Sequence, residues 1–302
     1  MREKIKTIRN TDELEEFFGI KKYFFDNFDL VLMHPESIQK LRIKKRRWWF
    51  RYVYIIKNPI YGAFIDKLKK TLNEIYASHD AVHWFVKRRS NVTNAKNHLN
   101  KKVVVNVDIK NFFESISIEC VESLLLDNGW NNFISKFIAK SCCYNGKLST
   151  WFATSPVISN MVCRTMDDDL SSISIQRWYK YTRYCDDMTF SWDWSRENIR
   201  DDVLKVLDKY GFTINSKKYR EQYKWFSQYV TWLTVCEKDR PRIPKKIKKN
   251  LRLEAYYIKK YGEKEHMDRG KSRLKWAISF LWRVDYIRKL EPKLVEYIES
   301  CF

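Results

Sequence analysis

The chain has 302 residues, 44% of them hydrophobic, which is enough for one large domain with a small appendage or for two modest domains. Its 58 Lys and Arg outnumber 37 Asp and Glu, and the formal net charge of +21 favours a polyanionic partner, nucleic acid ahead of an anionic membrane. The first residues do not resemble a signal peptide, no long apolar run is present, and seven scattered cysteines suggest reduced thiols. We therefore expect a cytoplasmic protein with no segment in a membrane.

The first part of the chain predicts helices around one basic hairpin. Residues 1–40 have the pattern of short helices. Basic and aromatic side chains alternate over residues 42–58, and the β-forming residues at 48–56 predict a hairpin. Apolar residues then recur at helical spacing over residues 60–77.

The later part of the chain alternates between strand-like and helical patterns. In residues 103–109, Asn106 and Asp108 alternate with valines, which predicts a strand with two distinct faces. Ser155 is predicted to cap a helix that has Pro156 in its first turn. The remaining predictions are a helix over 157–170, strands over 179–184 and 188–192, a helix over 198–210, a strand over 228–236, and helices after Pro244 with breaks at Gly262 and Gly270. Because no βαβ cadence is present, the sequence predicts an α+β fold with a largely antiparallel sheet.

Three acids stand out as candidates for chemistry. Asp108 ends an apolar strand, and Asp186 and Asp187 lie at the turn of an aromatic hairpin. Carboxylates beside buried strands cost free energy unless a cation pairs with them, and two Mg²⁺ ions could serve here, with Mn²⁺ as an alternative. Taken alone, the Asp-Asp pair is also compatible with an ordinary turn. The acids at 167–169 are interpreted as the solvated face of a helix.

Four segments together resemble the catalytic motifs of a reverse transcriptase palm. In chain order they are VDIKNFFESI at 107–116, ATSPVISN at 153–160, RYCDDMTFS at 183–191 and YGFTINSKK at 210–218. Three further segments resemble those of bacterial retron-type reverse transcriptases: NAKNH at 94–98, QYVT at 228–231 and RPRIPKK at 240–246. The resemblance covers the chain from about residue 40 and is weakest before it.

The resemblance implies a right-hand polymerase fold. We expect an N-terminal helical segment at 1–40, fingers and palm at 41–236, and a small basic helical thumb at 237–302. It also implies an RNA-directed DNA polymerase that extends a primer 3′-hydroxyl with deoxynucleotides on a dedicated structured non-coding RNA, in antiphage defence. The RNA would be the template and a candidate primer, and an effector protein encoded nearby is a candidate partner.

Two other functions stay open at this point. One is a divergent defence reverse transcriptase that makes DNA by protein-primed, repetitive or template-independent synthesis. The other is a catalytically silent RNA-binding scaffold, against which the intact acids argue.

The resemblance also implies roles at the reacting centre. Asp108 and Asp186 would bind the metals, and Asp187 would complete the acidic cluster. Lys218, or its neighbour Lys217, would donate a proton to the leaving pyrophosphate.

The nucleotide would contact three residues. Phe113, or alternatively Phe112, would exclude a ribose 2′-hydroxyl, and Ile109 would lie beside the nucleotide. Arg51 would bind the triphosphate, with a general contact to the template backbone as the alternative.

Nucleic acid would contact several further residues. Tyr184 would lie near the primer terminus or pack in the core, and His98 is interpreted as structural rather than RNA-binding. The basic residues Arg240, Arg242, Lys245, Lys246 and Lys249 would line a duplex, unless they form a solvated face.

Two tryptophans depart from the family pattern. Thr150-Trp151 replaces the usual Gln-Gly pair of the second motif, and Trp232 follows Val230-Thr231 where glycine is usual. Glycine would let template and nucleotide approach the backbone closely, whereas tryptophan cannot. These rings could stack on a base, block a template or hold a special RNA, which suggests a specialised defence-associated member.

Overall fold

The computed structural model describes residues 2–44, 50–194, 198–268 and 273–301, without the side chains of 2–3 and 263–278. Its N-terminal part consists of short helices, as predicted: η1 (Arg2–Thr7), α1 (Thr11–Phe18), α2 (Lys22–Asp26) and α3 (Phe28–Met33). Phe18 and Phe25 pack edge-on against Phe64 of α4 (Pro59–Ile75), with ring centroids 4.9 and 5.7 Å away. These helices therefore share one hydrophobic core with the rest of the chain.

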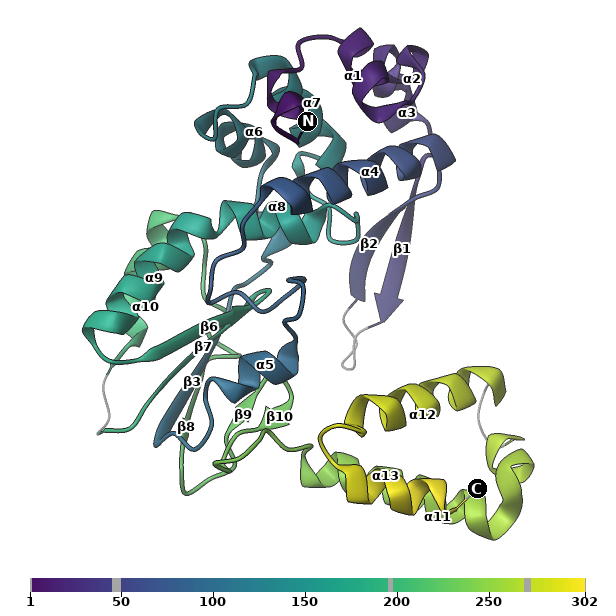
Figure 1. The fold of residues 1–302 in the computed structure, drawn as a ribbon, viewed down its shortest axis with the longest axis vertical. Helices are drawn as coiled ribbons and strands as arrows, with labels where there is room; N and C mark the ends of the chain where they lie inside the picture. The colour runs from purple at the N-terminus through teal and green to yellow at the C-terminus, as the bar shows by residue number, and fades with distance from the viewer. Residues whose placement is uncertain (1, 45–49, 195–197, 269–272, 302) are drawn as a thin grey trace.

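A basic hairpin projects beside α4 (Figure 1). It pairs β1 (Ile38–Lys44) with β2 (Phe50–Ile56) antiparallel, so its first strand begins before the predicted hairpin. The tryptophans at 48 and 49 lie outside the described residues. Cations lie over rings on this hairpin: Lys40 over Tyr52 and Arg42 over Phe50, each 4.3 Å from the ring centroid.

A four-stranded antiparallel sheet forms the centre of the molecule, in the order β6-β7-β3-β8. Its strands are β3 (Val103–Asp108), β6 (Lys180–Tyr184), β7 (Asp187–Trp192) and β8 (Arg220–Tyr223). Val103, Val105 and Val107 enter the main core, whereas Val104 joins a second core on the opposite face, as strand alternation requires. The predicted α+β class with antiparallel sheets is confirmed.

Helices and two small strands surround this sheet. They are α5 (Asn91–Lys96), η2 (Phe113–Ser115), α6 (Ile118–Asp127), α7 (Asn132–Cys142), β4 (Cys143–Tyr144), β5 (Lys147–Leu148), α8 (Ser155–Val162), α9 (Arg164–Gln176) and α10 (Arg200–Lys209). Two local predictions are wrong here. Thr154, not Ser155, is the N-cap residue of α8, and the single helix predicted over 157–170 is divided at Cys163.

The strand predicted over 228–236 is in fact a tight hairpin. Its strands are β9 (Tyr229–Val230) and β10 (Leu233–Thr234), and the turn between them holds Thr231 at φ 42° and Trp232 at φ 71°. Left-handed backbone is unfavourable for both side chains, which explains why local pattern predicted a continuous strand.

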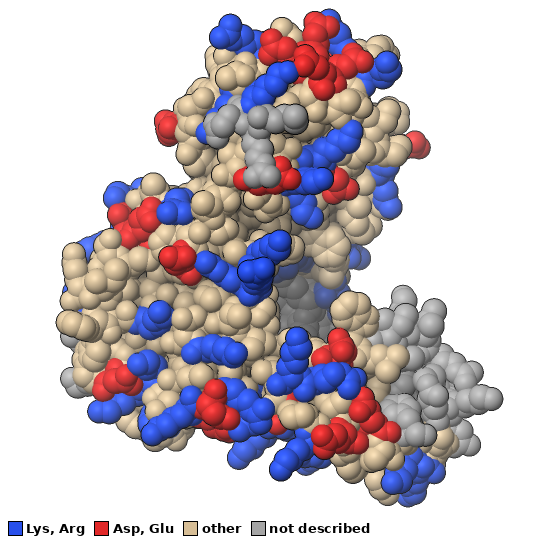
Figure 2. Space-filling view, viewed as in Figure 1, with Lys and Arg blue, Asp and Glu red and all other residues tan. Residues whose placement is uncertain are grey.

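The C-terminal part consists of α11 (Lys245–Asp268), α12 (Arg273–Ile287) and α13 (Pro292–Glu299), as the helical prediction required. Gly262 interrupts α11 at φ 82°, as predicted, and Gly270 lies outside the described residues. Phe280, Val284 and Leu294 belong to a second hydrophobic core that these helices build. Figure 2, in the same view as Figure 1, shows a hollow between the upper part of the molecule and the C-terminal helices. Within the described ranges, no helix has the length and apolar character needed to cross a bilayer.

Candidate active site

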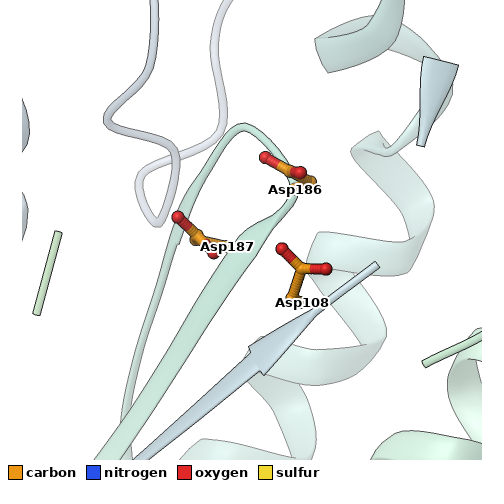
Figure 3. A group of neighbouring side chains, drawn as sticks. All are labelled: Asp108, Asp186 and Asp187. Atoms are coloured by element: carbon orange, nitrogen blue, oxygen red, sulfur yellow. The ribbon is translucent and has the colours of Figure 1, made fainter. Parts of the chain in front are cut away.

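Three carboxylates meet at one end of the central sheet (Figure 3). Asp108 is the last residue of β3 and pairs in register with Asp187, the first residue of β7, while Asp186 occupies the preceding turn. One carboxylate oxygen from each residue lies within 4.8 Å of the others. The sheet register therefore brings together acids that are almost 80 positions apart in sequence.

Crowding of these acids changes their protonation. Burial and the nearby charge of Asp108 raise the pKa of Asp186. Burial and the charges of Asp186 and Asp108 raise the pKa of Asp187 to about 7. A bound divalent cation would remove the repulsion, and the all-oxygen donor set suits Mg²⁺ or Mn²⁺. The residues present therefore fit the metal that the sequence implies.

Asp108 is held by the segment that resembles the fourth motif. Lys218 Nζ lies 2.5 Å from Asp108 Oδ2, and Asn215 Nδ2 donates to Asp108 Oδ1 at 2.9 Å. Burial lowers the pKa of Lys218, but its hydrogen bond with Asp108 and the charges of the three acids together outweigh burial, so the net shift is upward. No local pattern in the sequence marked Asn215, whose backbone N–H also donates to the Asp108 carbonyl at 2.8 Å.

The turn is tied to β3 through the backbone. Ile109 N–H donates to the Asp186 carbonyl at 3.0 Å, and Ile109 forms an antiparallel bridge with Ile214. The position of Ile109 therefore connects the first, third and fourth motif-like segments.

A cavity of about 640 Å³ opens beside the acids. Asp108, Asp186 and Lys218 line one side of this cavity. Arg51 of the basic hairpin and Trp151 of the second motif-like segment line other parts of it. Trp151 is half exposed, so its ring is accessible from this space. Phe113 and Ile109 are also in the lining, so the nucleotide-contacting residues that the sequence suggested share one cavity.

The structure distinguishes the two adjacent phenylalanines. Phe112 is buried and packs against Phe212 with ring centroids 5.8 Å apart. Phe113 is only partly buried and lies 5.9 Å from the ring of Trp84, which also lines the cavity. Both phenylalanines line the cavity, and Phe113 is the more exposed of the two. Sequence analysis missed Trp84, because nothing in its neighbourhood marks it as more than a core aromatic.

A second cavity of about 350 Å³ lies on the other side of Asp187. Thr189 of the central sheet, Trp232 of the β9-β10 turn and Ile247 of α11 line it, so this cavity lies between the sheet and the C-terminal helices. Tyr184 is half-buried, and its ring meets Trp232 edge-on with centroids 6.1 Å apart. The two departures from the family pattern therefore lie in different cavities on either side of the acids.

The basic residues near the C-terminal helices are not equivalent. Arg242 pairs with Glu237 at 2.6 Å, and Arg240 lies 3.5 Å from Asp239. Three others are exposed near the start of α11, namely Lys245, Lys246 and Lys249. The lysines are thus better placed than the arginines for phosphates. Lys217 is exposed and, unlike Lys218, does not line either cavity.

The interpretation of residues 167–169 as a solvated acidic face holds for the exposed Asp168 but is wrong for Asp167. Asp167 is fully buried and pairs with Arg183 at 2.7 Å. Asp169 binds Lys209 at 2.7 Å on a neighbouring helix. A helical pattern alone could not reveal these partners, because both come from other elements.

His98 is fully buried beneath the sheet. Its two ring nitrogens lie 2.7 Å from the hydroxyls of Ser191 and Thr182. These contacts agree with the structural role predicted for it.

Comparison with known proteins adds a family to this geometry. No family model matches the chain. The chain is 29% identical over 239 residues to the Retron Ec86 reverse transcriptase of Escherichia coli, covering 75% of this chain and 72% of the relative. It is 30% identical over 241 residues to the Retron Mx162 reverse transcriptase of Myxococcus xanthus, covering 68% of this chain but only half of that relative.

A third relative is aligned along nearly its whole length. The Retron Ec83 reverse transcriptase of Escherichia coli is 24% identical over 292 residues, covering 90% of this chain and 92% of the relative. Among solved structures, a Candida albicans telomerase in complex with a fragment of telomeric RNA is 13% identical, covering 92% of this chain and 59% of its own, with a TM-score of 0.48 that is too low to assign a fold. Several retron relatives aligned over much of the chain place it in one family. The chain belongs to the retron-type reverse transcriptases, which are RNA-directed DNA polymerases.

Proposed function

We propose that this chain copies a dedicated structured RNA into DNA by adding deoxynucleotides to a primer 3′-hydroxyl. The observation that carries the proposal is the meeting of Asp108, Asp186 and Asp187 at the wall of a large cavity. An accessible space beside clustered carboxylates is where a metal-bound triphosphate can be held.

Asp108 and Asp186 would hold the metals, with Asp187 completing the cluster. Two Mg²⁺ ions, or Mn²⁺, would activate the 3′-hydroxyl and stabilise the leaving pyrophosphate when bound. Lys218 is close enough to the acids to deliver a proton to the pyrophosphate, since its ammonium group lies 2.5 Å from Asp108.

The cavity walls would select the nucleotide. Arg51 presents a guanidinium that can bind phosphate oxygens in a bidentate manner. Phe113 would contact the sugar where a ribose carries its 2′-hydroxyl, and Ile109 would lie beside it. Exclusion of the hydroxyl by an aromatic ring is a steric effect that requires the ring to face the cavity.

We divide the chain into an N-terminal helical segment (1–40), fingers and palm (41–236) and a thumb (237–302), although the first boundary falls within β1 (Ile38–Lys44) and belongs a few residues earlier. The C-terminal helices supply most of the second hydrophobic core, which also includes Val104 of β3 and Val230 of β9, so the proposed thumb packs against the sheet rather than on a core of its own. The exposed Lys245, Lys246 and Lys249 would bind the phosphates of an A-form duplex, more by shape than by sequence. Tyr184 would lie near the primer, while Arg240 and Arg242 would contribute less because they are already paired.

The biological setting belongs to the same proposal. A structured non-coding RNA would supply the template and, in one arrangement, the primer. The activity would serve antiphage defence in the cytoplasm, together with an effector protein encoded nearby.

A second function is favoured by one observation. Trp151 is 51% exposed in the nucleotide cavity, and Trp232 is 66% exposed beside Asp187. Rings at these places can stack on bases or obstruct a continuous template. Protein-primed, repetitive or template-independent DNA synthesis is therefore the alternative.

Sequencing the nucleic acid that copurifies with the chain would separate these functions. A defined RNA with DNA complementary to it supports the first, and DNA without a complementary template supports the second. The Asp186→Asn variant should yield no DNA, whereas the exposed control Asp208→Asn should yield the normal amount. DNA in unchanged amount from Asp186→Asn would overturn the catalytic assignment, and RNA without any DNA from the natural protein would point to a scaffold.

A further inference from the structure

A buried ion pair lies directly behind the catalytic turn. Arg183, the residue before Tyr184, forms two parallel hydrogen bonds with Asp167 of α9: Nε to Oδ1 at 2.8 Å and Nη2 to Oδ2 at 2.7 Å. Neither side chain is exposed to solvent. Tyr181 donates a third hydrogen bond to the same carboxylate, at 2.7 Å. The pair is therefore fully satisfied on the carboxylate side.

The guanidinium has one further partner, which belongs to the turn itself. Arg183 Nη1 donates to the carbonyl oxygen of Cys185 at 3.1 Å. Cys185 has φ 61°, a left-handed conformation that non-glycine residues seldom adopt without tertiary support. This carbonyl belongs to the peptide that leads into Asp186. The direction of the guanidinium thus helps to fix the backbone from which a candidate metal ligand projects.

The backbone of Arg183 is also hydrogen-bonded to the segment that leads into the cavity wall at Trp84. Its N–H donates to the Ala81 carbonyl at 2.8 Å, and its own carbonyl accepts from His83 N–H at 2.9 Å. The next residue, Trp84, lies against Phe113. One residue therefore connects the acid-bearing turn with the wall that would contact the sugar.

We propose that Asp167 and Arg183 are positioning residues that set the geometry of the catalytic turn. The proposal rests on the proposed function, because it treats Asp186 as a metal ligand. Stability alone does not require a buried ion pair, since well-packed apolar residues can often replace one without loss. What apolar residues cannot supply is a donor to the Cys185 carbonyl, and lysine cannot supply the same planar fork.

The decisive variant replaces both charges with apolar side chains, Asp167→Leu with Arg183→Met. We expect this double variant, purified as the full chain with its RNA, to fold, with a thermal midpoint lowered because the buried Tyr181 hydroxyl loses its acceptor. Its kcat should fall about tenfold or more, and the Mg²⁺ concentration for half-maximal activity should rise by a similar factor, the scale of one lost hydrogen bond to a charged donor. The KM for deoxynucleotides should change little, because Arg51 and Phe113 are intact.

Tyr181→Phe is the matched control. It removes a hydrogen bond to the same buried carboxylate but leaves the contact between Arg183 and Cys185, so its Mg²⁺ dependence should match that of the natural protein. Natural kcat and Mg²⁺ dependence in the double variant would overturn the positioning role. If the double variant does not fold, Arg183→Lys decides the question: a raised Mg²⁺ requirement supports the role, and an unchanged one overturns it.

The two proposals fail in different ways. Activity retained by Asp186→Asn would overturn the proposed function itself. An inactive Asp186→Asn variant beside a fully active double variant would overturn only the positioning role.

Discussion

Replacement of His98 by Gln should change how the stability of the protein depends on pH. Burial is the main cause that lowers the pKa of His98 from 6.5 to about 3 in the folded protein. As the pH falls, His98 therefore binds a proton near pH 6.5 in the unfolded chain but only near pH 3 in the folded chain. Stability from this residue is present above pH 6.5 and is lost as the pH falls toward 3.

The size of the effect follows from these two values. One unit of pKa difference is worth about 1.36 kcal/mol, and pH 4.5 lies two units below 6.5 while still above the folded value. The natural protein should therefore lose about 2.7 kcal/mol between pH 7.5 and 4.5 through His98 alone. Gln cannot titrate but can still hydrogen-bond to Ser191 and Thr182, so the stability of its variant should fall by about 2.7 kcal/mol less than that of the natural protein between pH 7.5 and 4.5.

Urea unfolding followed by tryptophan fluorescence at pH 7.5, 6.0 and 4.5 measures this difference. His83, whose pKa burial lowers to about 4, also lowers the pKa of His98, so the double variant His83→Gln with His98→Gln should be compared with His83→Gln alone. The exposed His34→Gln variant is the control and should follow the natural protein at each pH. Parallel pH profiles for the natural protein and His98→Gln would refute the buried neutral imidazole, and a loss of RNA affinity in the variant at pH 7.5 without loss of stability would indicate an RNA contact instead.

Three other predictions concern the site. Phe113→Ala should allow incorporation of ribonucleotides, measured as a rise in the ratio of ribo- to deoxynucleotide kcat/KM. Phe112→Ala should instead lower the thermal midpoint because that ring is buried. Unchanged sugar selectivity in Phe113→Ala would show that this ring does not exclude the 2′-hydroxyl. Arg51→Ala should raise the KM for deoxynucleotides by about tenfold or more, as loss of a charge-assisted phosphate contact costs on the order of 1.5–3 kcal/mol, and an effect confined to template affinity would favour the backbone contact. Changing Lys245 and Lys249 to Gln should lower the slope of log affinity against log salt by roughly 1.5–2 for an RNA duplex, and an unchanged slope would place the duplex elsewhere.

The sequence by itself predicted the three acids, the α+β class and most of the strands that carry the acids. Alternation in residues 103–109 placed Asp108 at a strand end, and the adjacent aspartates of the turn completed the cluster once four motif-like segments agreed. These features are local, because side-chain period and turn chemistry depend on neighbours in the chain. The cluster was therefore predictable before any contact between distant segments was known.

Only the tertiary structure decided which groups neutralise one another. Asp167, predicted on a solvated face, is buried in an ion pair with Arg183, and Arg242 pairs with Glu237. It also turned the chain at Thr231 and Trp232, where local preference favours a continuous strand. The physical reason is that burial, charge pairing and left-handed backbone are set by contacts between elements, whereas sequence periodicity reports only which face of one element is apolar.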